Sequence, residues 1–112
     1  MSPASPDPAA VTTAAIFAAL GDATRLTLLS RLREGQPLSI AQLTRGTGLS
    51  RQGVSKHLVV LEQARLVASR RVGRESRFAL EPDALREAQR YLERASQQWD
   101  DAIARLKDFV EE

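Results

Sequence analysis

The sequence predicts a mainly α-helical fold with one small β-hairpin. Several short segments carry apolar residues at helical spacing, and each is bounded by a capping residue, a glycine or a proline. Two later segments are joined by a short loop that contains a glycine, which is typical of a hairpin. The last segment, residues 82–110, repeats apolar side chains every seventh position, as a long helix does when it packs on a second helix.

The composition of the 112-residue chain excludes several classes of protein. The length suits a single domain with its own core. The absence of cysteine excludes disulfides and thiolate metal sites. The apolar runs are far shorter than the ~20 residues of a membrane helix, and the start lacks the features of a secretory signal. We therefore expect a cytoplasmic protein, with a disordered arm at residues 1–8 and a single domain at residues 9–112.

Two helices are predicted after this arm. Residues 9–20 are rich in alanine, with Ile16 and Phe17 among the apolar positions, and predict the first helix. Asp22 is a good N-cap for the second helix, because its carboxylate can accept a hydrogen bond from a free backbone N–H of the first turn. The apolar stripe of the second helix is expected at Leu26, Leu29 and Leu32.

Two short helices separated by a glycine-containing turn are predicted in the centre of the chain. Leu38 is expected in a very short extended segment. Ser39 and Gln42 have the spacing of a capping box and open the first of the two helices. Gly46 and Gly48 suit the turn, since glycine accepts positive φ without a Cβ clash. This is the arrangement of a helix-turn-helix.

The second helix of this pair, residues 50–65, has two different faces. Val54, Leu58 and Leu61 form a stripe to be buried, and Ser50 is the expected N-cap. The other face presents groups that can hydrogen-bond the base edges and phosphates of DNA. We predict base contacts from Arg51, Gln52, Ser55 and Lys56.

A basic hairpin is predicted next, from residues 66–72 and 75–80. Gly73 is the first of its two loop residues, which suits a type II′ turn. Phe78 and Leu80 are the inward candidates of the second strand. The hairpin is rich in arginine and follows directly on the predicted DNA-contacting helix, residues 50–65, which we call the recognition helix. This concentration of arginine favours contacts with the DNA backbone or minor groove over ordinary solvated charge. These arginines are Arg70, Arg71, Arg74 and Arg77.

The last helix, residues 82–110, is expected to pair with a second copy of the chain. Pro82 is well placed in its first turn. An apolar stripe of this length exceeds what one small domain covers, so a dimer is favoured over packing within the chain. Trp99 is the expected anchor or else a lid on the core, since tryptophan is frequent in interfaces. The heptad positions are Leu85, Leu92, Trp99 and Leu106.

Charge is distributed unevenly along the chain. Residues 25–77 hold 11 Lys/Arg and 3 Asp/Glu, whereas residues 78–112 hold 5 Lys/Arg and 9 Asp/Glu. A basic centre with an acidic C-terminal part fits a surface that binds a polyanion. Solvated surface charge is the alternative, and charge alone does not decide between the two.

The predicted element order, α-α-β-α-α-β-β-α, is that of a winged helix-turn-helix. The segments LGDATRL (residues 20–26), LSRQGVSKHL (49–58) and LEQARLV (61–67) resemble the ArsR family of bacterial transcriptional repressors. The resemblance implies a homodimer that places residues 50–63 in the major groove of double-stranded DNA, with residues 67–80 on adjacent backbone or minor groove. It also implies a dimer interface built from the first and last helices. Its expected residues are Ile16, Phe17, Leu85, Leu92, Trp99, Ile103 and Leu106.

Two positions need separate interpretation. His57 either packs or hydrogen-bonds within the helix-turn-helix, or it contacts a DNA phosphate together with Ser50 and the wing arginines. A metal or catalytic role is the third alternative, although no nucleophile or triad partner is apparent for it. Arg65 stands where the family usually has glycine, just past the recognition helix, where a left-handed residue is common.

The sequence offers no recognisable signal site. Many ArsR relatives sense metals or arsenic through cysteines, or through His/Asp/Glu sets on the last helix. This chain has no cysteine and one histidine, so we expect no metal and no cofactor. It is most similar to the metal-independent, autorepressor-like branch of the family, and its inducer is unknown.

The predicted function is that of a sequence-specific transcriptional repressor acting as a homodimer on a palindromic operator. An enzyme is not expected, because no nucleophile–base or carboxylate pair is apparent. Two alternatives stay open. One is a winged-helix module for protein interactions, which would not need the cationic recognition face. The other is a repressor gated by a small organic ligand at the dimer interface.

Overall fold

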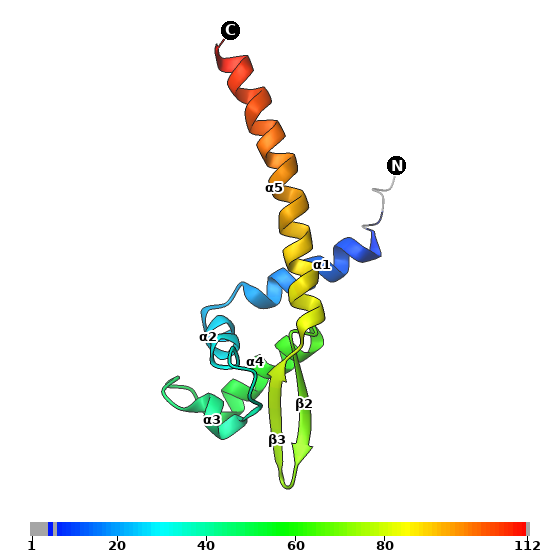
Figure 1. Cartoon of the computed structure of the whole chain (residues 1–112). Coiled ribbons are helices and arrows are strands. Elements are labelled where there is room, and N and C mark those ends of the chain that lie inside the picture. Colours follow the sequence, from blue (N-terminus) through cyan, green and yellow to red (C-terminus); the bar gives the residue numbers. More distant parts are fainter. Residues whose placement is uncertain (1–4, 6, 112) are drawn as a thin grey trace.

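The computed structural model of the chain describes residue 5 and residues 7–111 (Figure 1). Residues 1–4 and 6, most of the predicted arm, lie outside the described residues. The described part contains the helices and strands in the predicted order. They are α1 (Pro8–Leu20), α2 (Ala23–Arg31), β1 (Leu38–Ser39), α3 (Ile40–Thr44), α4 (Arg51–Gln63), β2 (Val67–Val72), β3 (Glu75–Leu80) and α5 (Pro82–Glu111).

Side-chain caps fix where the first three helices begin. Asp7 accepts a hydrogen bond from the backbone N–H of Ala9 at 2.9 Å, so α1 begins one residue before the predicted start. The carboxylate of Asp22 accepts from the backbone N–H of Arg25 at 3.0 Å. Both hydrogen bonds of the predicted capping box at the start of α3 are present, at 2.9 and 3.2 Å. These caps confirm that local sequence determines the helix starts.

The strands form one antiparallel sheet in the order β1-β3-β2. The short β1 places Leu38 opposite Phe78 of β3. Gly73 in the hairpin turn has a φ of 65°, as the first loop position of a type II′ turn requires. Phe78 is buried, as predicted, and Val67 is the buried residue of β2. Leu80 packs partly against the core, as predicted, and the tip of the hairpin projects beyond it (Figure 1).

The core lies between the helix-turn-helix, α2 and the base of the hairpin. The predicted stripe of α4, Val54, Leu58 and Leu61, is fully buried in it. Leucine 43 of α3 and Leu66, just after α4, complete this apolar cluster. Burial of a leucine side chain contributes roughly 1.5–3 kcal/mol, so this cluster holds α4 firmly in place.

The predicted stripe of α2 is confirmed at Leu29 and Leu32 and wrong at Leu26. Leu28 and Leu32 are buried, whereas Leu26 is 51% exposed. Leu29 and Leu32 fit both arrangements at helical spacing, so the spacing alone could not choose between Leu26 and Leu28. The observed stripe follows from where α2 meets α4 and not from the pattern itself.

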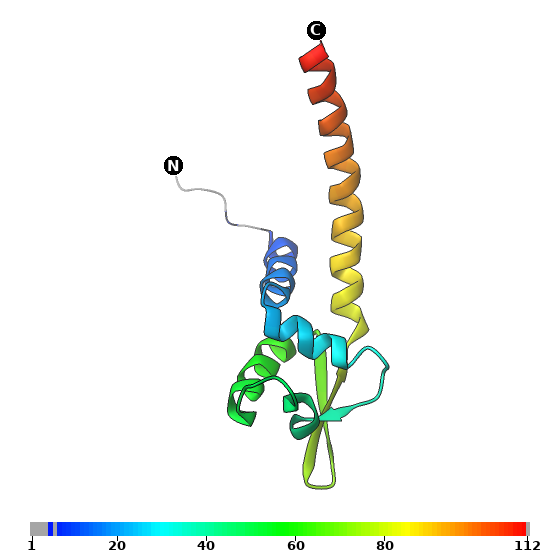
Figure 2. The same cartoon turned by 90° about the vertical axis from the view of Figure 1, so that its left-hand side faces the viewer.

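Helix α5 is by far the longest element and extends away from the rest of the molecule (Figures 1 and 2). It gives the protein principal extents of 66 × 36 × 23 Å. Helix α1 lies beside its first half, and every residue from Ser96 to Glu111 is exposed. Neither α5 nor any other helix in the described part of the chain combines the length and apolarity needed to cross a membrane.

Candidate nucleic-acid interface

The N-terminal half of α4 presents polar side chains away from the core. The Ser50 hydroxyl accepts from the backbone N–H of Gly53 at 3.0 Å, which caps the helix as predicted. Arg51, Gln52 and Lys56 are exposed, and Ser55 is half-buried. The predicted base-contacting residues therefore share one accessible surface, while the opposite face of the helix is buried.

The turn before α4 is held by contacts that sequence reasoning missed. The guanidinium of Arg31 donates to the carbonyl of Leu43 at 2.8 Å and to the carbonyl of Arg45. Gly46 and Gly48 both have a φ of 74°, which explains why glycine occupies these positions. A single arginine on α2 gives no sequence signal for such a role, because the carbonyls it binds belong to a distant turn.

The hairpin forms a wing beside α4. Arg70, Arg71 and Arg74 are exposed on it, and Arg77 is half-buried. The Nε of Arg77 lies 3.4 Å from a carboxylate oxygen of Glu75. Arg70 and Arg77 are direct cross-strand partners, an arrangement in which like charges repel. The wing thus carries positive charge that its own residues do not fully compensate.

An open cavity of about 460 Å³ separates the start of α4 from the wing. It brings together four predicted DNA-contacting residues, Arg51, Gln52, Ser55 and Arg74. Lys56, His57, Arg70, Arg71 and Arg77 do not line it. Its other lining residues, which the sequence did not point to, are Ser39, Ile40, Ala41, Glu75 and Ser76.

His57 faces the start of α2. Its Nδ1 lies 3.4 Å from Nη1 of Arg25 and 3.8 Å from Oδ2 of Asp22. This is the arrangement that the packing interpretation of His57 predicts. The hydrogen bond from the backbone N–H of Arg25 lowers the pKa of the Asp22 carboxyl below its ordinary value, and the nearby charges of Arg25 and His57 lower it further.

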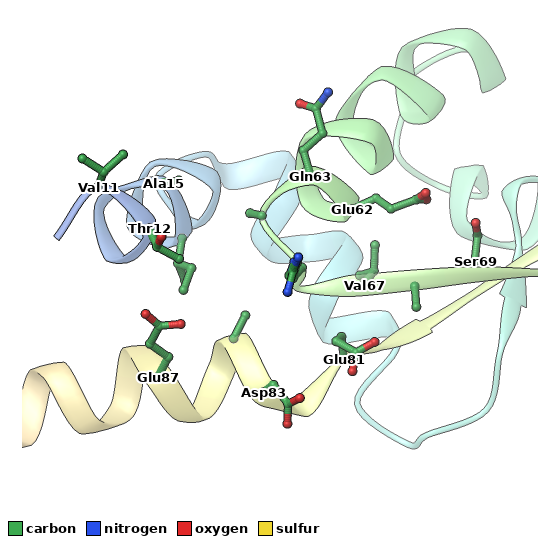
Figure 3. A pocket seen from close by; sticks show the side chains of 15 residues that line it. Val11, Thr12, Ala15, Glu62, Gln63, Val67, Ser69, Glu81, Asp83 and Glu87 are labelled. Atoms are coloured by element: carbon green, nitrogen blue, oxygen red, sulfur yellow. The ribbon is translucent and has the colours of Figure 1, made fainter. Parts of the chain in front are cut away.

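A second open cavity has a different character. It has a volume of about 940 Å³ and lies between α1, the end of α4, β2 and the start of α5 (Figure 3). Its lining includes four carboxylates and one arginine. An acidic lining repels phosphate, so DNA is expected on the α4–wing side. The charged lining residues are Glu62, Arg65, Glu81, Asp83 and Glu87.

The predicted interface residues separate into two groups. Ile16 is 1% exposed and belongs to the core of its own chain, so the prediction that it contacts a partner is wrong. It lies on the face of α1 that turns toward the core, which the alanine-rich sequence did not reveal. Phe17 and Leu85 also pack partly against the core, and Phe17 contacts the ring of Tyr91 edge-on at 5.5 Å.

The remaining interface candidates stand free on α5. Trp99 is 61% exposed, and its apolar neighbours along the helix are similarly accessible. We call this surface the α5 face. It consists of Leu92, Trp99, Ile103, Leu106, Phe109 and Val110, of which Phe109 and Val110 were not among the predicted interface residues.

Comparison with known proteins agrees with this geometry. Residues 20–70 match a family described as a helix-turn-helix domain. The chain is 43% identical over 67 residues to the HTH-type transcriptional regulator Rv2034 of Mycobacterium tuberculosis, a match that covers 60% of this chain and 62% of that protein. It is 44% identical over 66 residues to the uncharacterized HTH-type transcriptional regulator YuzN of Bacillus subtilis, covering 54% of this chain and 72% of that protein.

The structural likeness extends over most of the molecule. An ArsR-like transcriptional regulator from Rhodococcus sp. RHA1 superposes with a TM-score of 0.74 at 37% sequence identity. The match covers 89% of this chain and 93% of that chain, so it includes the helices on both sides of the helix-turn-helix. The chain therefore belongs to the ArsR family of winged helix-turn-helix transcriptional regulators.

Proposed function

We propose that the chain represses transcription by binding DNA as a homodimer at a palindromic operator. One observation carries this proposal. The exposed polar half of α4 and the basic wing flank the same open cavity, so Arg51, Gln52 and Arg74 can reach one DNA segment together. Side chains of α4 would read base edges in the major groove, while the wing and Ser50 would hold the backbone.

The α5 face supports a dimer. It exposes a run of large apolar side chains with Trp99 at its centre, which is unfavourable in water unless another surface covers it. A twofold axis would give two copies of α4, about 34 Å apart, for successive major grooves. This spacing predicts an operator with two inverted half-sites.

The side-chain inventory supports a repressor that does not use a metal as its signal. The sequence has no cysteine. Within the described residues, no three histidine, aspartate or glutamate side chains cluster as a metal site requires. A cytoplasmic location would follow from this role.

Selection of DNA from a random pool by the purified protein tests the proposal. We expect enrichment of an inverted repeat, and a complex of two chains per site by native mass spectrometry. Absence of any enriched palindrome would contradict a sequence-specific repressor. It would leave the protein-interaction module as the better interpretation of this fold.

Gln52 provides the sharper test of the recognition helix. Gln52→Ala should alter the selected sequence at one or two base pairs of each half-site, because the amide can pair with an adenine edge. Loss of such a pair costs about 1–3 kcal/mol of discrimination. Gln36→Ala, on an exposed loop before β1, is the matched control and should select the wild-type sequence. An unchanged preference in Gln52→Ala would refute the assignment of this face.

A further inference from the structure

A cluster of three polar side chains joins α1, α2 and α4. Arg25 of α2 donates from Nε to the carbonyl of Ala19 at 2.6 Å and from Nη2 to that of Ala18 at 3.1 Å, both at the C-terminal end of α1. Its third nitrogen, Nη1, lies 3.4 Å from Nδ1 of His57. Figure 2 shows α1 leading directly into α2, with α4 beneath them. One guanidinium therefore links the end of α1 to the recognition helix.

The same imidazole nitrogen has a second partner of opposite charge. Oδ2 of Asp22 lies 3.8 Å from Nδ1 of His57. A neutral imidazole without a proton on Nδ1 accepts a hydrogen bond from Arg25. A protonated imidazole carries N–H groups on both nitrogens, so Nδ1 can only donate, and Asp22 is then the acceptor within reach. Protonation thus exchanges one partner for the other.

The other elements packed on α4 bring no competing group to His57. Helix α3 contains no titratable residue, and the two arginines of β2 are exposed on the wing. Arg31 of α2 is bonded to carbonyls around the end of α3. The charged groups that face His57 from neighbouring elements are therefore Asp22 and Arg25. The exposed charged residues of α4 itself are Arg51, Lys56 and Glu62.

We propose that Arg25 is a positioning residue for the recognition helix, and that it acts only while His57 is neutral. When His57 gains a proton, Arg25 loses its acceptor on α4 and is repelled by the imidazolium. The link that Arg25 makes between α4 and the end of α1 is then lost, α4 keeps only its contact with Asp22 at this junction, and affinity for DNA falls. DNA binding therefore weakens when His57 becomes protonated.

The sign of the pH dependence makes this inference distinctive. The proposed role of Arg25 and His57 rests on the DNA binding proposed above. A direct contact between His57 and a DNA phosphate predicts the opposite dependence on pH. In that case protonation would add a positive charge beside the phosphate and strengthen binding. The two roles of His57 are therefore separated by one titration.

The titration uses the full chain and its selected operator, with fluorescence anisotropy at constant ionic strength. We expect affinity to fall about tenfold between about pH 7.5 and about pH 5.5, because a hydrogen bond to a charged group is lost. His57→Asn should lose this pH dependence, since its amide oxygen takes the position of Nδ1 and does not titrate.

Arginine 25 is tested by a change that keeps the charge. Arg25→Lys should weaken binding about tenfold at about pH 7.5 and remove the pH dependence, because one ammonium does not span the α1 carbonyls and the imidazole. Arg33→Lys, at an exposed arginine of the same region, is the matched control and should behave as the wild type.

The protonation state can be read directly, since His57 is the single histidine of the chain. Its ¹⁵N imidazole signals should show Nδ1 without a proton under the conditions in which DNA binding is strongest. A proton on Nδ1 in the neutral ring, affinity that is constant or rises at low pH, or a pH dependence that survives in His57→Asn would overturn the proposal. If the wild type bound no DNA even at neutral pH, the proposed function itself would be wrong.

Discussion

Arg65 shows how a residue can occupy a position that favours glycine. It is the one non-glycine residue of positive φ in the described part of the chain, at 60°. Its N–H donates to the carbonyl of Glu62 at 3.0 Å, and the N–H of Leu66 donates to that of Leu61 at 2.9 Å. These are the two hydrogen bonds of a Schellman motif. Leu61 and Leu66 are both fully buried, so apolar packing holds the turn against the strain at Arg65.

Replacing this arginine should therefore stabilise the fold. Arg65→Gly should raise the free energy of unfolding by about 1 kcal/mol, because a left-handed residue with a Cβ costs about 1–2 kcal/mol and the greater freedom of unfolded glycine offsets part of the gain. Urea denaturation measures the difference. Arg65→Ala keeps the Cβ and should give no such gain; equal stabilisation by both changes would show that the backbone is not the cause.

At the scale of the element, α5 divides into two halves with different surroundings. Ala84, Ala88 and Ala95 are buried, and these small residues let the helix approach the rest of its own chain. Every residue from Ser96 to Glu111 is exposed, although the seven-residue repeat of apolar residues continues there. Of the four heptad positions, Leu85 thus packs within the chain, and Leu92, Trp99 and Leu106 are available to a partner.

A charge at the centre of the α5 face should separate the proposed dimer. In Trp99→Glu the carboxylate would lie unpaired in an apolar interface, which costs about 3 kcal/mol, or roughly a hundredfold in the dissociation constant. Analytical ultracentrifugation should show monomers where the wild type is dimeric. Gln97→Glu adds the same charge on the other side of the helix and should leave the dimer intact. Equal masses for Trp99→Glu and wild type would contradict the assigned interface.

At the scale of the whole molecule, opposite charges lie on opposite parts. The wing and the start of α4 are basic, whereas the charged residues that line the cavity beside α1 and the start of α5 are four carboxylates and one arginine (Figure 3). Such a distribution orients the protein as it approaches a polyanion and keeps α5 away from it. The net charge of +2 alone would not have suggested this.

The salt dependence of DNA binding should report this arrangement. Arg74→Ala should weaken binding to all sequences alike, and should reduce the slope of log affinity against log salt by about 2 for a dimer, since each phosphate contact contributes about 0.9. Arg90→Ala removes the same charge from α5 and should leave the slope unchanged. An unaltered slope in Arg74→Ala would place the wing outside the DNA contact.

The sequence predicted those features that depend on neighbouring residues. The caps at Asp22, Ser39 and Ser50 and the turn at Gly73 each involve only a few adjacent positions, and all are present. How helices are rotated against one another was predicted for α4, whose buried stripe is unambiguous, but not everywhere. The inward faces of α1 and α2 and the direction of His57 could not be predicted, because periodicity gives the spacing of a stripe but not the partner it meets.

The free C-terminal half of α5 has a consequence for regulation in the proposed dimer. A helical segment without tertiary packing is only marginally stable in water, so its folding and the pairing of two chains are coupled. Well below the dissociation constant, the amount of dimer then varies as the square of the amount of chain, and halving the supply lowers the dimer about fourfold by mass action. The abundance of the protein would itself act as an input that sets operator occupancy.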